Sequence, residues 1–197
     1  MHTAAKLALV FLAVAAVPAP GAAQGPDDLT AIYDPAVRHS RVSVALRRVA
    51  RTPSNPRMDL YFETSHLDTV PARPVEMFEL SLGAVITHGQ APRFTGVDEG
   101  TLLVDDSVEI RLEGEYRAGQ WMETVALPVS HPQALRLAAA RTVHGRIGGW
   151  EFRLAPAEIA RIGRLLAYAR LDPAAPKPVR YTVIPPGEMS GVGRATP

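Results

Sequence analysis

Cysteine is absent from the chain, and lysine is nearly so, with only Lys6 and Lys177 beside nineteen arginines. The lack of cysteine excludes disulfide bonds, a thiolate nucleophile and thiolate metal ligands, so the fold must be held by packing. It also removes the residue that would carry the lipid of a bacterial lipoprotein. Lys177 lies in a proline-rich stretch, which argues against Schiff-base chemistry because that chemistry needs a desolvated lysine.

Sequence motifs of the common enzyme classes are also missing. The chain has no Gly-x-Ser-x-Gly elbow, Ser-x-x-Lys pair, phosphate-binding glycine loop, His-Glu-x-x-His helix or EF-hand loop. The formal net charge is +1, whereas nucleic-acid binding usually shows itself as a strong basic excess. We therefore assign no catalytic, cofactor-binding or metal-binding residue from motifs, and expect no cofactor and no nucleic-acid partner.

The N-terminus has the three parts of an export signal. His2 and Lys6 precede an apolar run over residues 7–17, and small residues follow up to Ala23. Eleven apolar residues are too few to cross a bilayer, which takes about 20. We expect residues 1–23 to be a signal peptide that is cleaved after Ala23. The mature protein would then be periplasmic or secreted, without integral membrane association.

Turn-forming residues suggest where the rest of the chain divides into a lead-in, a domain and a tail. Gly25-Pro26 and Asp34-Pro35 predict a loose lead-in over residues 24–40. Residues 41–172 fit a single globular β-rich domain. Residues 173–197 are rich in proline and glycine and are expected to be a mobile tail, although residues 179–184 could add a late strand.

Apolar residues alternate with polar ones along most of this domain, which is typical of half-buried strands. A tight turn at Asp105-Asp106-Ser107 predicts one hairpin, and a proline-containing loop near residues 52–56 predicts another. The pattern favours a sandwich-like or strongly curved antiparallel sheet. The expected strands cover residues 42–46, 58–64, 78–86, 102–104, 108–112 and 121–129.

The apolar period then changes to that of helices. Ser130 and Gln133 match a capping box for a helix ending near Ala140. Gly148-Gly149 predicts a two-residue hairpin turn in which Ile147 faces Trp150, with positive φ required at Gly149. A final helix begins at Pro156. The predicted fold class is therefore α+β, mainly antiparallel β with a C-terminal helix–β-hairpin–helix unit that ends at Asp172-Pro173.

The final helix has an apolar stripe and a basic face. We expect the stripe to dock on the apolar side of the preceding hairpin, and the arginines to remain solvated. The stripe consists of Ile159, Ile162, Leu166 and Ala169; the basic face consists of Arg161, Arg164 and Arg170.

Histidines provide the only candidate for metal chemistry. His39, His66 and His88 lie near predicted strand ends, and Asp68 follows His66 by two residues, so loops could bring them together around a zinc-like ion. Scattered histidines without close pairs are more often surface or turn residues. No metal site is assigned from them.

Charge is unevenly distributed along the chain. Residues 98–123 contain eight acids and two arginines, whereas residues 136–170 contain seven arginines and two acids. These segments could form an acidic cation-binding or partner surface opposed to a basic one, for a second copy of the chain or for anionic envelope material. Alternatively, their charges balance as solvated faces of one domain.

The sequence thus favours an exported, non-catalytic binding or accessory module whose partner is an unknown protein or envelope ligand. The alternative is a small metal-dependent hydrolase that uses His66, Asp68 and His88.

Overall fold

A computed structural model describes residues 29–52, 55–86, 91–119, 122–175, 177–178 and 180–183. These residues form a mainly β structure with two helices and largely antiparallel sheets, which agrees with the predicted class. One sheet has seven strands in the order β11 (Arg180–Val183), β1 (Thr30–Asp34), β2 (His39–Thr52), β3 (Asn55–Leu67), β4 (Met77–Val85), β8 (Met122–Ser130) and β7 (Glu115–Ala118). The other has four strands in the order β10 (Trp150–Leu154), β9 (Val143–Ile147), β5 (Glu99–Val104) and β6 (Val108–Glu113).

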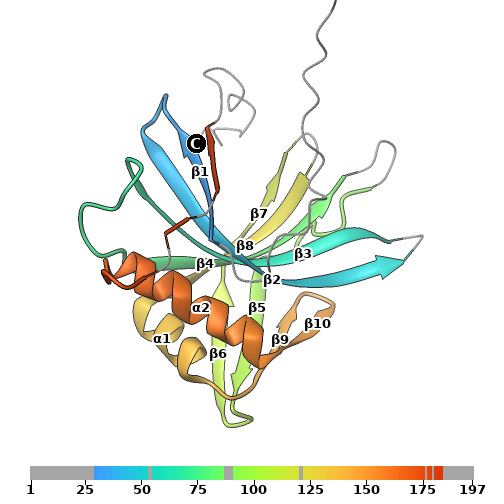
Figure 1. The fold of residues 1–197 in the computed structure, drawn as a ribbon. Coiled ribbons are helices and arrows are strands. Elements are labelled where there is room, and N and C mark those ends of the chain that lie inside the picture. The colour runs from blue at the N-terminus through green and yellow to red at the C-terminus, as the bar shows by residue number, and fades with distance from the viewer. Residues whose placement is uncertain are drawn as a thin grey trace, which may run out of the picture.

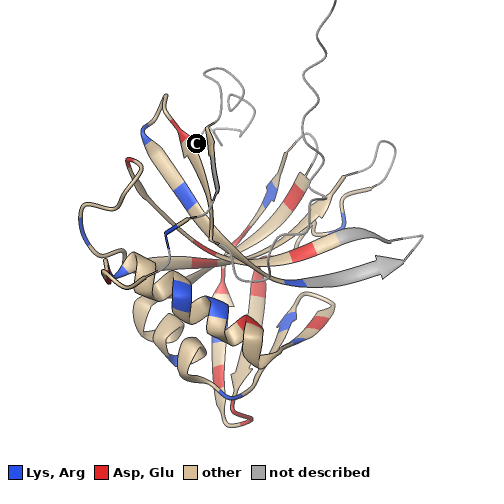
Figure 2. Ribbon diagram, viewed as in Figure 1, with Lys and Arg blue, Asp and Glu red and all other residues tan. Residues whose placement is uncertain are grey.

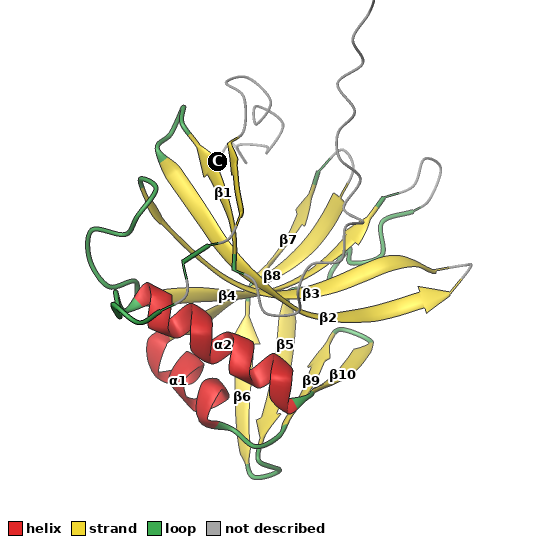
Figure 3. Cartoon of the chain, in the orientation of Figure 1, coloured by secondary structure: helices red, strands yellow, loops and turns green. Residues whose placement is uncertain are grey.

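One face of the seven-stranded sheet is covered by everything else in the fold. Helix α1 (His131–Ala139), helix α2 (Pro156–Ala169) and the four-stranded sheet all lie on this inner face (Figures 1 and 3). Alternate strand residues such as Val44, Phe62 and Leu80 point into this layer and are almost fully buried. Phe62 and Phe78 stack with ring centroids 5.6 Å apart. Burial of this shared apolar layer holds the architecture together.

The two sheets approach each other most closely at glycines. A Cβ at Gly100 of β5 would lie 2.6 Å from Leu127 Cδ1 of β8, so the missing side chain makes room for the facing sheet. Gly114 separates β6 from β7, where the chain leaves the small sheet and joins the large one. A Cβ at Gly114 would overlap the Ala126 carbonyl. Only glycine therefore allows this corner without movement of β8.

Helix α2 does not dock on the hairpin as expected. Its buried residues include Ile159, Ile162 and Leu166, but its main contacts are with α1 and β2, and its contact with β10 is slight. The apolar side of the small sheet instead faces the large sheet. Arg161 is also not simply solvated, because Nη1 donates to the carbonyl oxygens of Ala45 and Leu46, at 2.8 and 3.2 Å. These carbonyls lie beside a register shift in β2, where the regular ladder is interrupted.

Local turn and cap signals gave several correct predictions. Ile147 pairs with Trp150, and His144 with Arg153, in the predicted β9–β10 register. The β5–β6 turn has φ values of 49° and 54° at Asp105 and Asp106, as the acidic turn required.

The helix start at Ser130 follows its predicted pattern only in part. The Ser130 backbone N–H donates to Gln133 Oε1 at 2.8 Å, as the capping box requires. The Ser130 hydroxyl bonds to the same Gln133 oxygen instead of accepting a Gln133 proton.

Strands also form near both ends of the described chain. The segment read as a loose lead-in, residues 24–40, contains β1, which pairs with β2. Strand β11 lies within residues 179–184, where a late strand was allowed for, and it pairs in parallel with β1. Strand β7 was not anticipated. These short strands have little periodicity of their own and depend on long-range pairing. Residues 1–28, Trp121 and residues 184–197 lie outside the described residues.

In the Gly148-Gly149 turn, only Gly148 has a positive φ, 55°. The positive φ expected at Gly149 was therefore assigned to the wrong glycine.

Among the described helices, neither is long and apolar enough to cross a bilayer.

Replacing Gly148 with valine should lower the free energy of unfolding by about 1–3 kcal/mol, because a β-branched residue is strained at positive φ. A Cβ there would also lie 3.0 Å from both Val97 methyl carbons. Gly149→Val is the matched control, since nothing lies within 4 Å of its Cβ position. It should change stability by no more than about 0.5 kcal/mol. Equal losses in urea unfolding of the two variants would contradict this turn geometry.

Candidate functional site

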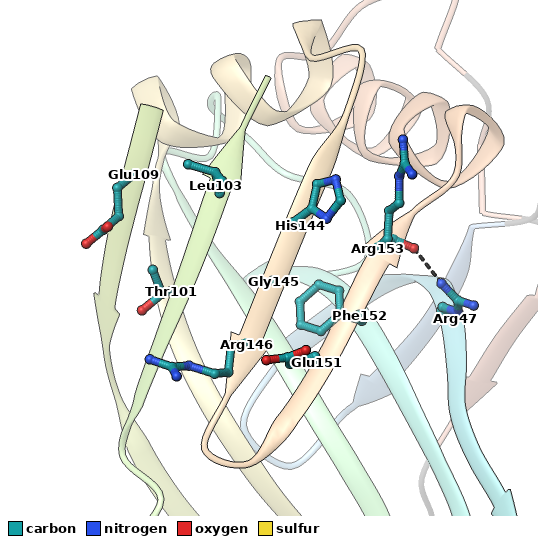
Figure 4. A pocket seen from close by; sticks show the side chains of 10 residues that line it. All are labelled: Arg47, Thr101, Leu103, Glu109, His144, Gly145, Arg146, Glu151, Phe152 and Arg153. Atoms are coloured by element: carbon teal, nitrogen blue, oxygen red, sulfur yellow. Dashed lines mark hydrogen bonds between the residues drawn. The ribbon is translucent and has the colours of Figure 1, made fainter. Parts of the chain in front are cut away.

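The outer face of the four-stranded sheet, which points away from the core, carries an open hollow. Its volume is about 680 Å3, within the range of about 300–1,000 Å3 typical of ligand pockets. Figure 4 shows its side chains spread over β5, β6, β9 and β10, with one arginine entering from β2. The lining residues are Arg47, Thr101, Leu103, Glu109, His144, Gly145, Arg146, Glu151, Phe152 and Arg153.

Sheet register places the polar lining side chains in two rows. Arg146 of β9 lies between Thr101 of β5 and Glu151 of β10. In the next row on the same face, His144 lies between Leu103 and Arg153. The β9–β10 part of this arrangement was predicted from the glycine turn. The addition of β5 beside β9 was not, because it pairs segments about forty residues apart in the sequence.

Several charges around the hollow are already engaged. Arg111 Nε lies 2.7 Å from Glu109 Oε1, and His144 Nε2 lies 3.7 Å from Asp106 Oδ1. Arg47 donates from Nη1 to the backbone carbonyl of Arg153, as the dashed line in Figure 4 marks.

Two guanidinium groups of the hollow have no acidic partner. Arg146 and Arg153 form no ion pair within the part of the chain that the structure describes. Both residues are exposed, so water solvates the two guanidinium charges and little free energy is lost when no ligand is bound. They remain available for an anionic group.

The floor of the hollow is built from a glycine and an aromatic ring. Gly145 pairs with Phe152, and a Cβ at Gly145 would overlap the Phe152 ring. The ring therefore occupies the space that a side chain would fill, as Figure 4 shows. Phe152 is 8% exposed and belongs to the core, so it fixes the β9–β10 surface at this point.

The structure places three of the four candidate metal ligands near one end of the large sheet. In the β2–β3 ladder, His39 is opposite Leu67 and Ser40 is opposite His66, and Asp68 follows directly. Burial, and then the charges of Arg41 and His66, lower the pKa of His39. His88 lies outside the described residues.

The side chains of His66 and Asp68 are already bonded to protein atoms. His66 Nδ1 lies 2.9 Å from the Leu67 carbonyl oxygen, which can only accept, so Nδ1 carries a proton. His66 Nε2 lies 2.9 Å from the Tyr168 hydroxyl, which donates to it in neutral imidazole. Arg38 holds Asp68 through an ion pair of 2.6 Å. Over the described residues, no three histidine or acidic side chains are grouped as metal ligands.

The acidic and basic segments are in contact within the small sheet. Strand β5 of the acidic segment pairs with β9 of the basic one, and Asp105 Oδ1 accepts bonds from the backbone N–H groups of Arg141 and Thr142. Those bonds, from Thr142 first, lower the pKa of Asp105. Figure 2 shows positions of both signs interspersed over the two sheets.

Sequence reasoning missed three buried acids, Asp34, Glu63 and Glu123. Glu123, 1% exposed, accepts bonds from the backbone N–H groups of Arg93 and Phe94, and so anchors the segment before β5. That segment places Phe94 edge-on to Trp150, with centroids 4.9 Å apart. Glu63 on β3 is also nearly buried. A charged residue at an alternating strand position looks exposed in sequence, and only the covering segments reveal otherwise.

Comparisons of the chain with protein families, with curated proteins and with solved structures returned no match.

Replacing Gly145 with alanine should displace the Phe152 ring and lower the free energy of unfolding by about 1–3 kcal/mol, as overpacked cores do. Gly163→Ala on α2 is the control, since its Cβ position has no neighbour within 4 Å. It should stabilise the protein by up to about 1 kcal/mol through helix propensity. Thermal or urea unfolding measures both. A neutral Gly145→Ala variant would contradict the glycine–ring contact.

Proposed function

We propose that this protein is an exported, non-catalytic binding module whose ligand site is the hollow on the outer face of the four-stranded sheet. The ligand is a small molecule or exposed group that bears carboxylate or phosphate oxygens. The observation that supports this most directly is the presence of Arg146 and Arg153 in the hollow without an acidic partner among the described residues.

Charge and shape support an anionic ligand. The lining contains the arginines Arg47, Arg146 and Arg153 against Glu109 and Glu151, which leaves a net positive charge. Arginine presents planar N–H donors that match carboxylate and phosphate oxygens. The acids of the lining would select against ligands with dense negative charge, because like charges would be placed together.

A rigid support behind the hollow also favours binding. We propose that α1, the β9–β10 hairpin and α2 act as one structural unit, a helix–hairpin–helix that carries six of the ten lining residues. Phe152 and Leu154 anchor the hairpin in the core, and the two helices pack on each other. Binding side chains on a packed scaffold lose little entropy when a ligand is held.

Calorimetric titration of the purified protein with citrate and with inorganic phosphate tests the site and separates the two oxygen sources. The double variant Arg146→Gln/Arg153→Gln should bind the preferred anion about tenfold or more weakly, since each charge-assisted hydrogen bond contributes about 1.5–3 kcal/mol.

Arg136→Gln is the control for this titration, because Arg136 is exposed on α1 and does not line the hollow. The affinity of this variant for the anion should equal that of the unaltered protein, and added salt should weaken anion binding by both proteins. If neither anion binds, or if the double variant binds as well as the control, the proposed site is wrong.

Export is the second part of the proposal and is supported by the N-terminal pattern alone. Expression of the full chain in a bacterial host should yield periplasmic or secreted protein whose intact mass begins at Gln24. Val10→Arg, which interrupts the apolar run, should retain the uncleaved chain in the cytoplasm. Recovery of uncleaved, unaltered protein from the cytoplasm would remove the basis for export.

A further inference from the structure

The outer face of the seven-stranded sheet holds a buried polar cluster that the proposed binding site does not use. Glu63 of β3 and Glu79 of β4 are directly opposite each other in the ladder. The hydroxyl of Ser81 lies 2.6 Å from Glu63 Oε1 and 2.8 Å from Glu79 Oε1. Ser81 is 2% exposed and Glu63 is 8% exposed, so both side chains are largely shielded from solvent.

The number of protons in this cluster follows from its geometry. A serine hydroxyl has one proton to donate, and an ionised carboxylate has none. If both acids were ionised, one of the two short contacts would join oxygens with no proton between them. We propose that Glu63 and Glu79 share one proton through Ser81, with Glu63 as the protonated partner.

The surroundings of the two acids determine which one holds the proton. Glu79 accepts bonds from Nη1 and Nη2 of Arg117, both at 3.1 Å, and this fork stabilises the ionised form. Glu63 has a weaker cationic contact, to Arg41, with 3.8 Å between Nε and Oε2, and the Arg41 side chain is half exposed. Neutral Glu63 donates to Ser81, and Ser81 then donates to ionised Glu79.

The direction of the pKa of Glu63 agrees with this assignment. Burial is the largest effect and raises the pKa. The charge of Arg41 and the hydrogen bond from Ser81 lower it, while the charge of Glu79 and a hydrogen bond to Glu79 raise it. Like charges directly opposite each other in a ladder also destabilise it, which gives an independent reason for one acid to be neutral.

The other groups facing the cluster come from each neighbouring strand. β2 contributes Arg41, and β4 contributes Glu79 beside Ser81. β7 contributes Arg117 and its partner Glu115, 2.7 Å apart. Farther along β3, the Tyr61 hydroxyl lies 3.4 Å from Asp59. The β8 residues on this face are uncharged: Thr124, Ala126 and Pro128.

A shared proton makes the centre of the sheet sensitive to pH. Below the ordinary glutamate pKa, Glu63 is protonated in both the folded and the unfolded chain. Between that value and the raised pKa, the folded chain keeps a proton that the unfolded chain releases, so stability falls as pH rises. Above the raised pKa, Glu63 is ionised opposite Glu79, and the β3–β4 contact is weakest.

Calorimetric unfolding of the full chain from about pH 5 to about pH 8 tests this, with each scan repeated in buffers of different ionisation enthalpy to count protons. Unfolding of the unaltered protein should release close to one more proton than unfolding of Glu63→Gln. The midpoint temperature of that variant should fall less with rising pH. Glu113→Gln, an exposed acid on β6, should behave like the unaltered protein.

Infrared spectra give a second readout that does not depend on variant stability. The unaltered protein should show the carbonyl stretch of one protonated carboxyl group that titrates above the ordinary glutamate pKa. The band should persist in Glu113→Gln, disappear in Glu63→Gln, and titrate at lower pH in Glu79→Gln, where the repelling charge is gone. Absence of the band from the unaltered protein, or an unchanged pH profile in folded Glu63→Gln, would overturn the proposal.

Discussion

Close packing of the small sheet on the inner face of the large one is the constraint on which the rest of the structure depends. Gly100 leaves room for Leu127, and Gly114 lets the chain pass from β6 to β7 beside the Ala126 carbonyl. With these contacts in place, the outer face of β5, β6, β9 and β10 is directed away from the core. The candidate binding hollow therefore depends on packing on the opposite side of the same strands.

Buried polar groups in this fold anchor segments that apolar contacts do not position alone. Glu123 holds the segment before β5 through backbone N–H groups, and Arg161 of α2 satisfies carbonyls at the irregular part of β2. In a chain without disulfides, such bonds fix particular loops and helix positions, since a buried polar atom without a partner carries a desolvation cost. The Glu63–Ser81–Glu79 cluster is of a different kind, because its hydrogen bonds depend on a proton that pH can remove.

The two outer faces consequently have different chemical characters. On the small sheet, exposed arginines and acids surround an open hollow, and their charges are screened by water. On the large sheet, Ser81 and Glu63 are nearly inaccessible, so the charge state of Glu63 depends on neighbouring protein groups.

The sequence by itself determined the local elements: the Asp105-Asp106 turn, the Gly148-Gly149 hairpin with its register, the starts of both helices and the alternating strands. Each depends on residues a few positions apart, whose backbone preferences act over short range. Tertiary structure alone decided that β1 and β7 are strands, that β11 pairs with β1, that α2 packs on α1 and β2, and that β5 lies beside β9. It also brought Arg47 to the hollow and Glu79 opposite Glu63, because these contacts join distant segments whose pairing is selected by burial of the whole core.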